Sequence, residues 1–97
     1  MPSAYVIADV YVTDPEQYKA YMALTPAAVA AAGGEFVVRG GRNQTLEGHW
    51  TPRRTVVIRF PTYEAAQAFY HSPLYTEARA ARAGATEFFN MIVVEGV

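Results

Sequence analysis

The sequence predicts an α+β fold of the ferredoxin-like type, with a four-stranded antiparallel sheet. Four segments are dense in β-branched and aromatic residues, and two segments between them have apolar residues at helical spacing. Their order along the chain is strand, helix, strand, strand, helix, strand, which is the split βαβ arrangement. Right-handed crossovers then place both helices on one face of the sheet. Because no linker or repeat interrupts this order, residues 1–97 are predicted to form a single domain.

The first predicted strand is "AYVIADVYV", residues 4–12. Successive side chains of a strand point to opposite faces. One face therefore carries the set Val6, Ala8, Val10 and Val12. The other carries Tyr5, Ile7, Asp9 and Tyr11. Both faces are largely apolar, so both are expected to be covered.

The first predicted helix begins after Asp14, a favourable N-cap residue, with Pro15 at its first position. Pro26 interrupts the helical pattern, and a proline disfavours helical geometry at the residue before it. The sequence therefore predicts a kink or a restart, with Thr25 as the new cap. Residues 33–34 are both glycine and are expected to end the helix.

Three further strands are predicted: "EFVVR" (35–39), "RTVVIRF" (54–60) and "EFFNMIVVE" (87–95). In the second strand, alternation groups Phe36 with Val38 and places Arg39 on the opposite face. In the third, Val56, Ile58 and Phe60 share a face. In the last, Phe89, Met91 and Val93 do.

The second helical segment lies between the third and fourth strands and is expected in two pieces. Thr62 caps the first piece, "HSP" breaks it, and Ser72 caps a second piece that opens with Pro73. This second piece is predicted to run to about Arg82, before Gly84 stops it.

Two helices can cover only one face of a four-stranded sheet, which leaves the other face exposed. That face, here called the outer face, is predicted to carry Tyr5, Ile7, Tyr11, Val37, Val57, Phe88, Ile92 and Val94. A large apolar patch on a monomer is a liability, so a second copy is expected to cover it. The sequence thus predicts a homodimer whose two sheets meet face to face.

Composition excludes several classes of function. Eight Lys and Arg against nine Asp and Glu give a formal net charge of −1, which provides no broad positive field for nucleic acid or an anionic membrane. There is no cysteine and no apolar run near the ~20 residues of a membrane span. The N-terminal segment lacks the pattern of an export signal, so a cytoplasmic location is expected.

Several stretches carry a resemblance to a known family: "VTDPEQYKAY", "GGEFVVRGGR", "LEGHWTPRRTVVIRFPTYEAAQAFYHSPLY" and the closing "VVEG". They resemble the DUF1330 family of the dimeric α/β-barrel superfamily. The resemblance implies a small-molecule cavity between the sheet and the helices of each subunit. The superfamily includes cofactor-independent monooxygenases, muconolactone isomerases and haem-binding chlorite dismutases. The chain departs from the expected family pattern at Pro26 and at "FFN", residues 88–90.

The stretch "RGGRNQTLEGHWTPRR", residues 39–54, is the first candidate site. Its glycines and Pro52 predict an irregular excursion between two strands and no tight hairpin. One interpretation is a pocket mouth in which an arginine fork holds a carboxylate or enolate. Its members would be Arg39, Arg42 or Arg53, Glu47, His49 and Trp50. The alternative, which the sequence favours, is that Glu47 pairs with one of the arginines while Trp50 packs against the partner subunit.

The segment "FYHSPLYTEARAAR" is the second candidate. Tyr70 and His71 lie at the break between helical pieces, and His71 is the best candidate for proton transfer. Tyr75, Arg79 and Arg82 share one helical face and are expected to be a solvated face more often than an anion site.

Charged residues on the sheet form a third set: Asp9, Arg39, Arg59 and Asn90 are expected to share the outer face. Asp9 is predicted to pair with Arg59 or Arg39, within a subunit or across the dimer. The histidines, His49 and His71, lack ligand spacing, so no metal is expected. No nucleotide-binding glycine loop is present and no cofactor is expected.

The sequence thus predicts a protein that binds a small organic molecule, anionic or aromatic, with Arg39, Glu47, Trp50, Arg53, Tyr70 and Tyr75 as candidate ligand-binding residues. The alternative is a cofactor-independent enzyme, monooxygenase-like or isomerase-like, that uses His71 and the arginines. RNA binding is disfavoured because "RTVVIRF" lacks the glycine and aromatics of the corresponding RNA-binding strand.

Overall fold

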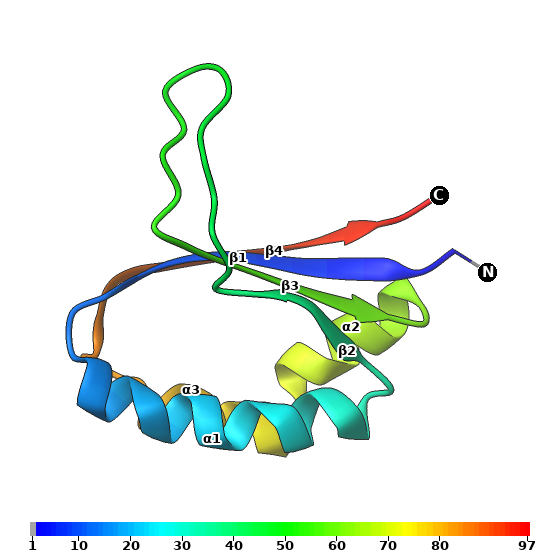
Figure 1. Cartoon of the computed structure of the whole chain (residues 1–97). Helices are drawn as coiled ribbons and strands as arrows, with labels where there is room; N and C mark the ends of the chain where they lie inside the picture. The colour runs from blue at the N-terminus through cyan, green and yellow to red at the C-terminus, as the bar shows by residue number, and fades with distance from the viewer. Residues whose placement is uncertain (1) are drawn as a thin grey trace.

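The computed structural model describes residues 2–97, which form one antiparallel sheet with helices on one side (Figure 1). In chain order the elements are β1 (Ala4–Val12), α1 (Pro15–Ala31), β2 (Glu35–Arg39), β3 (Arg54–Phe60), α2 (Tyr63–His71), α3 (Pro73–Ala81) and β4 (Thr86–Glu95). The strand order is β2-β3-β1-β4, so β2 and β4 are the edges. This arrangement confirms the predicted ferredoxin-like α+β fold.

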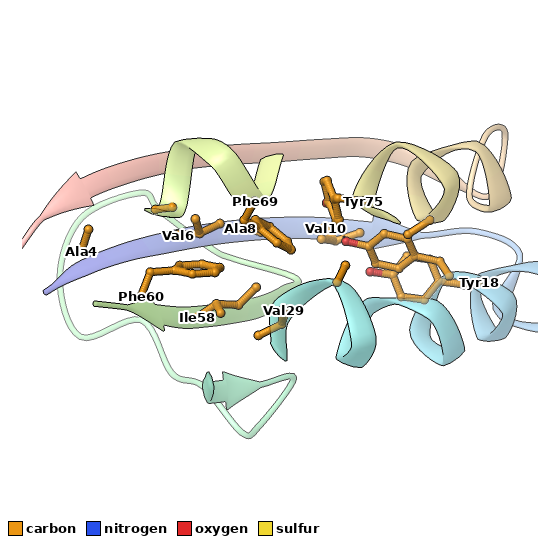
Figure 2. Packing of buried hydrophobic residues seen from close by; sticks show 14 of the residues in the cluster. Ala4, Val6, Ala8, Val10, Tyr18, Val29, Ile58, Phe60, Phe69 and Tyr75 are labelled. Carbon is orange, nitrogen blue, oxygen red and sulfur yellow. Dashed lines mark hydrogen bonds between the residues drawn. The ribbon is translucent and has the colours of Figure 1, made fainter. Parts of the chain in front are cut away.

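The face of β1 that points toward the helices is the one predicted from alternation. Ala4, Val6, Ala8 and Val10 are buried, and their side chains project into the layer between sheet and helices (Figure 2). β3 contributes Ile58 and Phe60 to the same layer. Burial of apolar surface stabilises a fold by about 25 cal/mol per Å². This layer, which holds the buried apolar residues, is therefore the main source of stability.

Aromatic rings fill the middle of this layer. Phe60, Phe69 and Tyr75 are all 0 % exposed. The ring of Phe69 lies 5.0 Å from that of Phe60 and 4.4 Å from that of Tyr75, centroid to centroid. α2 and α3 are thus fixed to the sheet and to each other through one stack of rings.

α1 begins and ends as predicted. The Asp14 carboxylate accepts a hydrogen bond from the Gln17 backbone N–H at 3.1 Å, which caps the first turn. At the other end Gly33 adopts a positive φ of 77°. The Gly33 N–H donates to Ala30 and the Gly34 N–H to Val29, the paired bonds of a Schellman ending.

The predicted restart at Pro26 is wrong, because α1 is continuous from Pro15 to Ala31. Pro26 has no N–H to donate to the Met22 carbonyl one turn earlier. Arg39 supplies the missing donor: its Nη2 lies 2.9 Å from the Met22 oxygen. Thr25 is no cap either, since its hydroxyl donates backward to the same oxygen at 3.4 Å.

α2 and α3 have the caps that the sequence predicts. The Thr62 hydroxyl accepts from the Ala65 N–H at 3.0 Å, and the Ser72 hydroxyl accepts from the Tyr75 N–H at 3.2 Å. Pro73 occupies the first position of α3. The break at Ser72 therefore turns the chain between two helices that pack on the same face.

β2 departs from the predicted alternation because it contains a β-bulge. Phe36 pairs with Ile58, but Val38 pairs with Val57 and Arg39 with Val56, so the register shifts between Phe36 and Val38. A bulge adds one unpaired residue and reverses the faces of the residues that follow it. Arg39 consequently faces the helices, and its predicted place on the outer face is wrong.

The outer face of the sheet carries the exposed apolar side chains predicted from alternation. Ile92 is 57 % exposed, Val37 53 % and Val94 43 %. Val38 is 36 % exposed and pairs with Val57 after the bulge, so its predicted place on the same face as Phe36 is wrong. Tyr11 and Phe88 meet edge to face on neighbouring strands, with ring centroids 5.9 Å apart. Within residues 2–97 no helix covers this face (Figure 1).

Residues 40–53 connect β2 to β3 without helix or strand, which confirms the predicted irregular excursion. We call this segment the arm. It leaves the sheet on the side opposite the helices and stands away from the rest of the chain (Figure 1).

Candidate functional site

A cavity of about 320 Å³ lies between α2 and β4 and is here called the α2–β4 cavity. This volume is within the range of about 300–1,000 Å³ that small-molecule sites occupy. Its apolar wall comes from the helix-facing side of the sheet and from α2: Val6, Ala66, Phe89, Met91 and Val93. Its polar wall comprises Gln67, Tyr70, His71 and Arg82.

The cavity opens at the β4 edge of the sheet. Ile92 also lines it, although this residue belongs to the outer face and is 57 % exposed. The opening therefore reaches the border between the helix-facing side and the outer face.

Arg82 is the one arginine among the residues that line the α2–β4 cavity. Its guanidinium carbon lies over the Phe89 ring, 3.6 Å from the centroid, and 5.2 Å from the centroid of Tyr21. The Nε of Arg82 is buried and has no hydrogen-bond partner within residues 2–97. The carbonyl groups at the C-terminal end of α3 favour a positive charge there, but none of them accepts a hydrogen bond from the Arg82 Nε–H. Arg82 thus presents positive charge beside an apolar wall, and it belongs to neither ion pair found among residues 2–97.

Tyr70 and His71 border the same cavity from the end of α2. Their rings meet edge to face with centroids 5.3 Å apart, and the Arg79 guanidinium lies 4.6 Å from the Tyr70 ring on its other side. Tyr70 is half-buried and His71 is exposed. The imidazole is therefore reachable both from solvent and from a molecule in the cavity.

A second, much smaller cavity of about 20 Å³ lies between α1 and the sheet. It has room for about one water molecule. Tyr18, Thr25, Arg39 and Arg54 are among the residues that line it. The Nε of Arg54 is buried without a hydrogen-bond partner in the described chain, but the volume admits no organic ligand.

Two tyrosines that line this small cavity, Tyr18 and Tyr21, have perturbed acidity. Burial raises the pKa of Tyr21, and its contact with Tyr75 raises it further. The two hydroxyl oxygens are 2.7 Å apart. Burial also raises the pKa of Tyr18, while the charges of Arg54 and Arg82 oppose that shift. Both groups stay protonated at neutral pH and act as hydrogen-bond donors or acceptors.

The structure disperses the ligand-binding set predicted from residues 39–54. Arg39 faces the helices and donates a hydrogen bond to the Met22 carbonyl. Glu47 and Trp50 lie in the arm, where both are exposed. The Arg53 guanidinium stacks on Tyr11 of the outer face, 4.1 Å from the ring centroid. These residues do not form one pocket mouth.

The ion pairs predicted around this stretch are also different. Glu47 belongs to neither ion pair found among residues 2–97. Asp9 pairs with no arginine side chain; its carboxylate accepts a hydrogen bond from the backbone N–H of Arg53 at 2.9 Å. Arg59 pairs instead with Glu35.

The second predicted set, from the segment "FYHSPLYTEARAAR", lies partly at the α2–β4 cavity. Tyr70 and His71 both line the α2–β4 cavity. Tyr75 is 0 % exposed, with its hydroxyl against Tyr21, so it supports the wall from within the core. Arg82 is half-buried, so the expectation of a solvated face does not hold for Tyr75 and Arg82.

Sequence reasoning passed over Arg54, although a signal was present. Alternation counted back from Phe60 through Ile58 and Val56 places Arg54 on the helix-facing side. For Arg82, the spacing from the buried Tyr75 gives the same inward direction.

Comparison with known proteins identifies the family. The family described as "Domain of unknown function (DUF1330)" matches residues 3–97. The chain belongs to this family. The DUF1330 resemblance stated from the sequence is therefore confirmed. No curated protein matches the chain.

Solved structures share the fold of this DUF1330 chain. The RPA0582 protein of unknown function from Rhodopseudomonas palustris is 20 % identical with a TM-score of 0.75, covering 99 % of this chain and 83 % of that one. A dimeric ferredoxin-like protein of unknown function from Jannaschia is 11 % identical with a TM-score of 0.68, covering 96 % and 98 %. A chain from Caulobacter crescentus, named "putative antibiotic biosynthesis monooxygenase", is 14 % identical with a TM-score of 0.62, covering 99 % and 91 %. At these identities the likeness establishes the fold alone.

Neither a metal-binding cluster nor a membrane-spanning helix is found among residues 2–97. Within residues 2–97 no group of three or more His, Asp or Glu side chains is placed to hold a metal ion. No helix in that range is long and apolar enough to cross a membrane.

Proposed function

We propose that this DUF1330 protein binds a small organic anion with an apolar or aromatic body in the α2–β4 cavity. The observation that carries the proposal is Arg82, the one arginine that lines the cavity, whose guanidinium lies over Phe89 at 3.6 Å and belongs to neither ion pair found among residues 2–97. A partly buried cation without a counter-charge favours an incoming anion, and an arginine gives it a charge-assisted hydrogen bond. The apolar wall would hold the rest of the ligand.

A thermal-shift experiment tests this with benzoate, benzyl alcohol and inorganic phosphate as probes. Benzoate has both the charge and the ring, whereas each of the others lacks one of them. At ten times its dissociation constant, benzoate stabilises the fold by about 1.4 kcal/mol. For a domain of this size that corresponds to a rise in Tm of about 6–11 °C. Benzyl alcohol and phosphate should give much smaller shifts.

The matched variants are Arg82→Gln and Lys19→Gln, which remove the same charge at different places. Lys19 lies on the exposed side of α1 in an ion pair with Glu16. Arg82→Gln should abolish the benzoate shift, and Lys19→Gln should keep it. A benzoate shift that survives Arg82→Gln, or the absence of any shift with wild-type protein, would refute the site.

The proposal includes a homodimer formed through the outer face. Exposed apolar side chains on β2 and β4 support it, because such a patch is unfavourable in water. Several solved structures of the same fold are described as dimeric. Light scattering at micromolar concentration should give twice the 10.7 kDa of one chain. A mass of one chain, independent of concentration, would contradict it.

A cofactor-independent enzyme is the second candidate function. One observation favours it: His71 lines the same cavity and is placed to exchange a proton with a bound molecule. An isomerase-like proton transfer would need no further group. Incubation with phenylpyruvate, an aromatic carboxylate whose keto and enol forms interconvert by transfer of one proton from carbon to oxygen, should then show a pH-dependent tautomerisation that His71→Ala eliminates. Benzoate binding without product, or turnover that His71→Ala leaves intact, would remove this role.

The cytoplasmic location stays a prediction.

A further inference from the structure

The arm, residues 40–53, presents large apolar groups far from the core. Leu46 is 90 % exposed and Trp50, the only tryptophan of the chain, is 69 % exposed. The Thr45 hydroxyl donates to the Trp50 carbonyl at 2.6 Å and holds the two sides of the arm together near its tip. A held segment that exposes its largest apolar side chains is typical of a surface that another molecule covers.

The base of the arm is attached to the outer face of the sheet. The Arg53 N–H donates to the Asp9 carboxylate at 2.9 Å, and the Arg53 guanidinium stacks on Tyr11 at 4.1 Å. Asp9 and Tyr11 both belong to the set that alternates toward the outer face. These contacts fix the direction of the arm away from the helices (Figure 1).

The length of the arm decides what it reaches. Each side has about seven residues, which at about 3.3 Å per residue extend up to ~23 Å. Two sheets packed face to face lie only about 10 Å apart. In a dimer formed through the outer faces, the arm must therefore pass alongside the sheet of the second copy.

We propose that the arm of each copy embraces the second copy, with Trp50 and Leu46 packed against it. This inference rests on the homodimer proposed above. The occupant is a second copy because the arm stands on the side of the sheet that carries the exposed apolar residues of β2 and β4, where the dimer is proposed to form (Figure 1).

Trp50 fluorescence tests the inference directly, since no other tryptophan contributes. In wild-type protein at micromolar concentration, the emission maximum should lie to the blue of that of free tryptophan, and acrylamide should quench it weakly. Ile92→Asp places a charge on the outer face and supplies a monomer with a free arm, once circular dichroism shows that it is folded. Its Trp50 emission should be red-shifted and its quenching constant at least twice that of wild type.

A second experiment measures the stability of the dimer itself. Trp50→Ala should raise the dissociation constant of the dimer at least tenfold in sedimentation equilibrium, while its circular dichroism spectrum keeps the wild-type shape apart from the lost indole signal.

The outcomes separate the two proposals. A wild-type dimer whose Trp50 is quenched as strongly as that of Ile92→Asp would overturn the role of the arm and leave the homodimer standing. An unchanged dissociation constant for Trp50→Ala would do the same. A wild-type monomer at every concentration would overturn both. A protected Trp50 in the monomeric variant would show that the arm packs on its own chain and would overturn the inference.

Discussion

Replacing Arg39 with methionine should destabilise the protein, because it leaves the Met22 carbonyl without its donor. Pro26 removes the helical N–H that would serve this carbonyl, and the Arg39 Nη2 takes its place at 2.9 Å. A hydrogen bond to a charged group contributes about 1.5–3 kcal/mol. Because Arg39 is an exposed residue, water replaces part of this bond. We therefore expect the free energy of unfolding to fall by about 1 kcal/mol.

The contribution of this bond is isolated by a double-mutant cycle with Pro26→Ala. Alanine at position 26 restores a helical N–H to Met22, so Arg39→Met should then cost only about 0.3 kcal/mol. Arg39 also lies over the Phe36 ring, 4.4 Å from its centroid. That contact is lost equally in both backgrounds and cancels in the cycle. The expected coupling is about 0.7 kcal/mol.

Urea denaturation followed by far-ultraviolet circular dichroism, at one fixed protein concentration, measures all four proteins of the cycle. Arg42→Met is the control, because Arg42 is an exposed arginine of the arm. It should change stability by less than about 0.5 kcal/mol. Equal losses from Arg39→Met with and without Pro26 would refute the account of how α1 continues through its proline.

Two further predictions concern backbone and acidity. Gly40 has a positive φ of 74° and a Cβ there would collide with the Arg54 guanidinium, so Gly40→Ala should lower the urea midpoint by an amount equivalent to at least about 1 kcal/mol. Gly41→Ala meets no atom within 4 Å and should leave the midpoint within error, and equal effects of the two substitutions would contradict this reasoning. Burial raises the pKa of Tyr21 and Tyr18 above the value of about 10 in the unfolded chain. The stability that these protonated hydroxyls contribute is therefore fully present below about pH 10 and is lost as the pH rises above it. The free energy of unfolding should fall by up to about 1.4 kcal/mol per pH unit for each tyrosine. Urea titrations between about pH 9 and 11 should show this fall, and Tyr21→Phe should make it shallower; an unchanged slope would exclude Tyr21 as a cause.

The sequence was sufficient wherever a structural feature depends on neighbours in the chain. The alternation of β1, the Asp14, Thr62 and Ser72 caps and the glycine ending of α1 all follow from local stereochemistry. Tyr70 was predicted beside the break between the helical pieces for the same reason, and it lines the α2–β4 cavity in the last turn of α2.

Features that depend on distant partners were missed. The continuity of α1 at Pro26 requires a donor from β2, which the pattern of α1 does not contain. The bulge between Phe36 and Val38 is a property of how β2 pairs with β3, and alternation alone assigns Arg39 to the wrong face. The position of Arg82 over Phe89 depends on how β4 lies against the end of α3, which helical spacing alone does not give.

The stretch from residue 39 to residue 54 shows why residues adjacent in sequence do not make a site. Its first and last arginines, Arg39 and Arg54, both line the small cavity beside α1. Between them the arm, which contains the exposed Trp50, stands on the opposite side of the sheet from the helices (Figure 1). Gly40, at the base, has a positive φ of 74°, which residues with a side chain rarely adopt, and it lies beside the Arg54 guanidinium. The base of the arm and the cavity beside α1 therefore share a wall, and the charge that the sequence gathers in one place is divided by the sheet between its two faces.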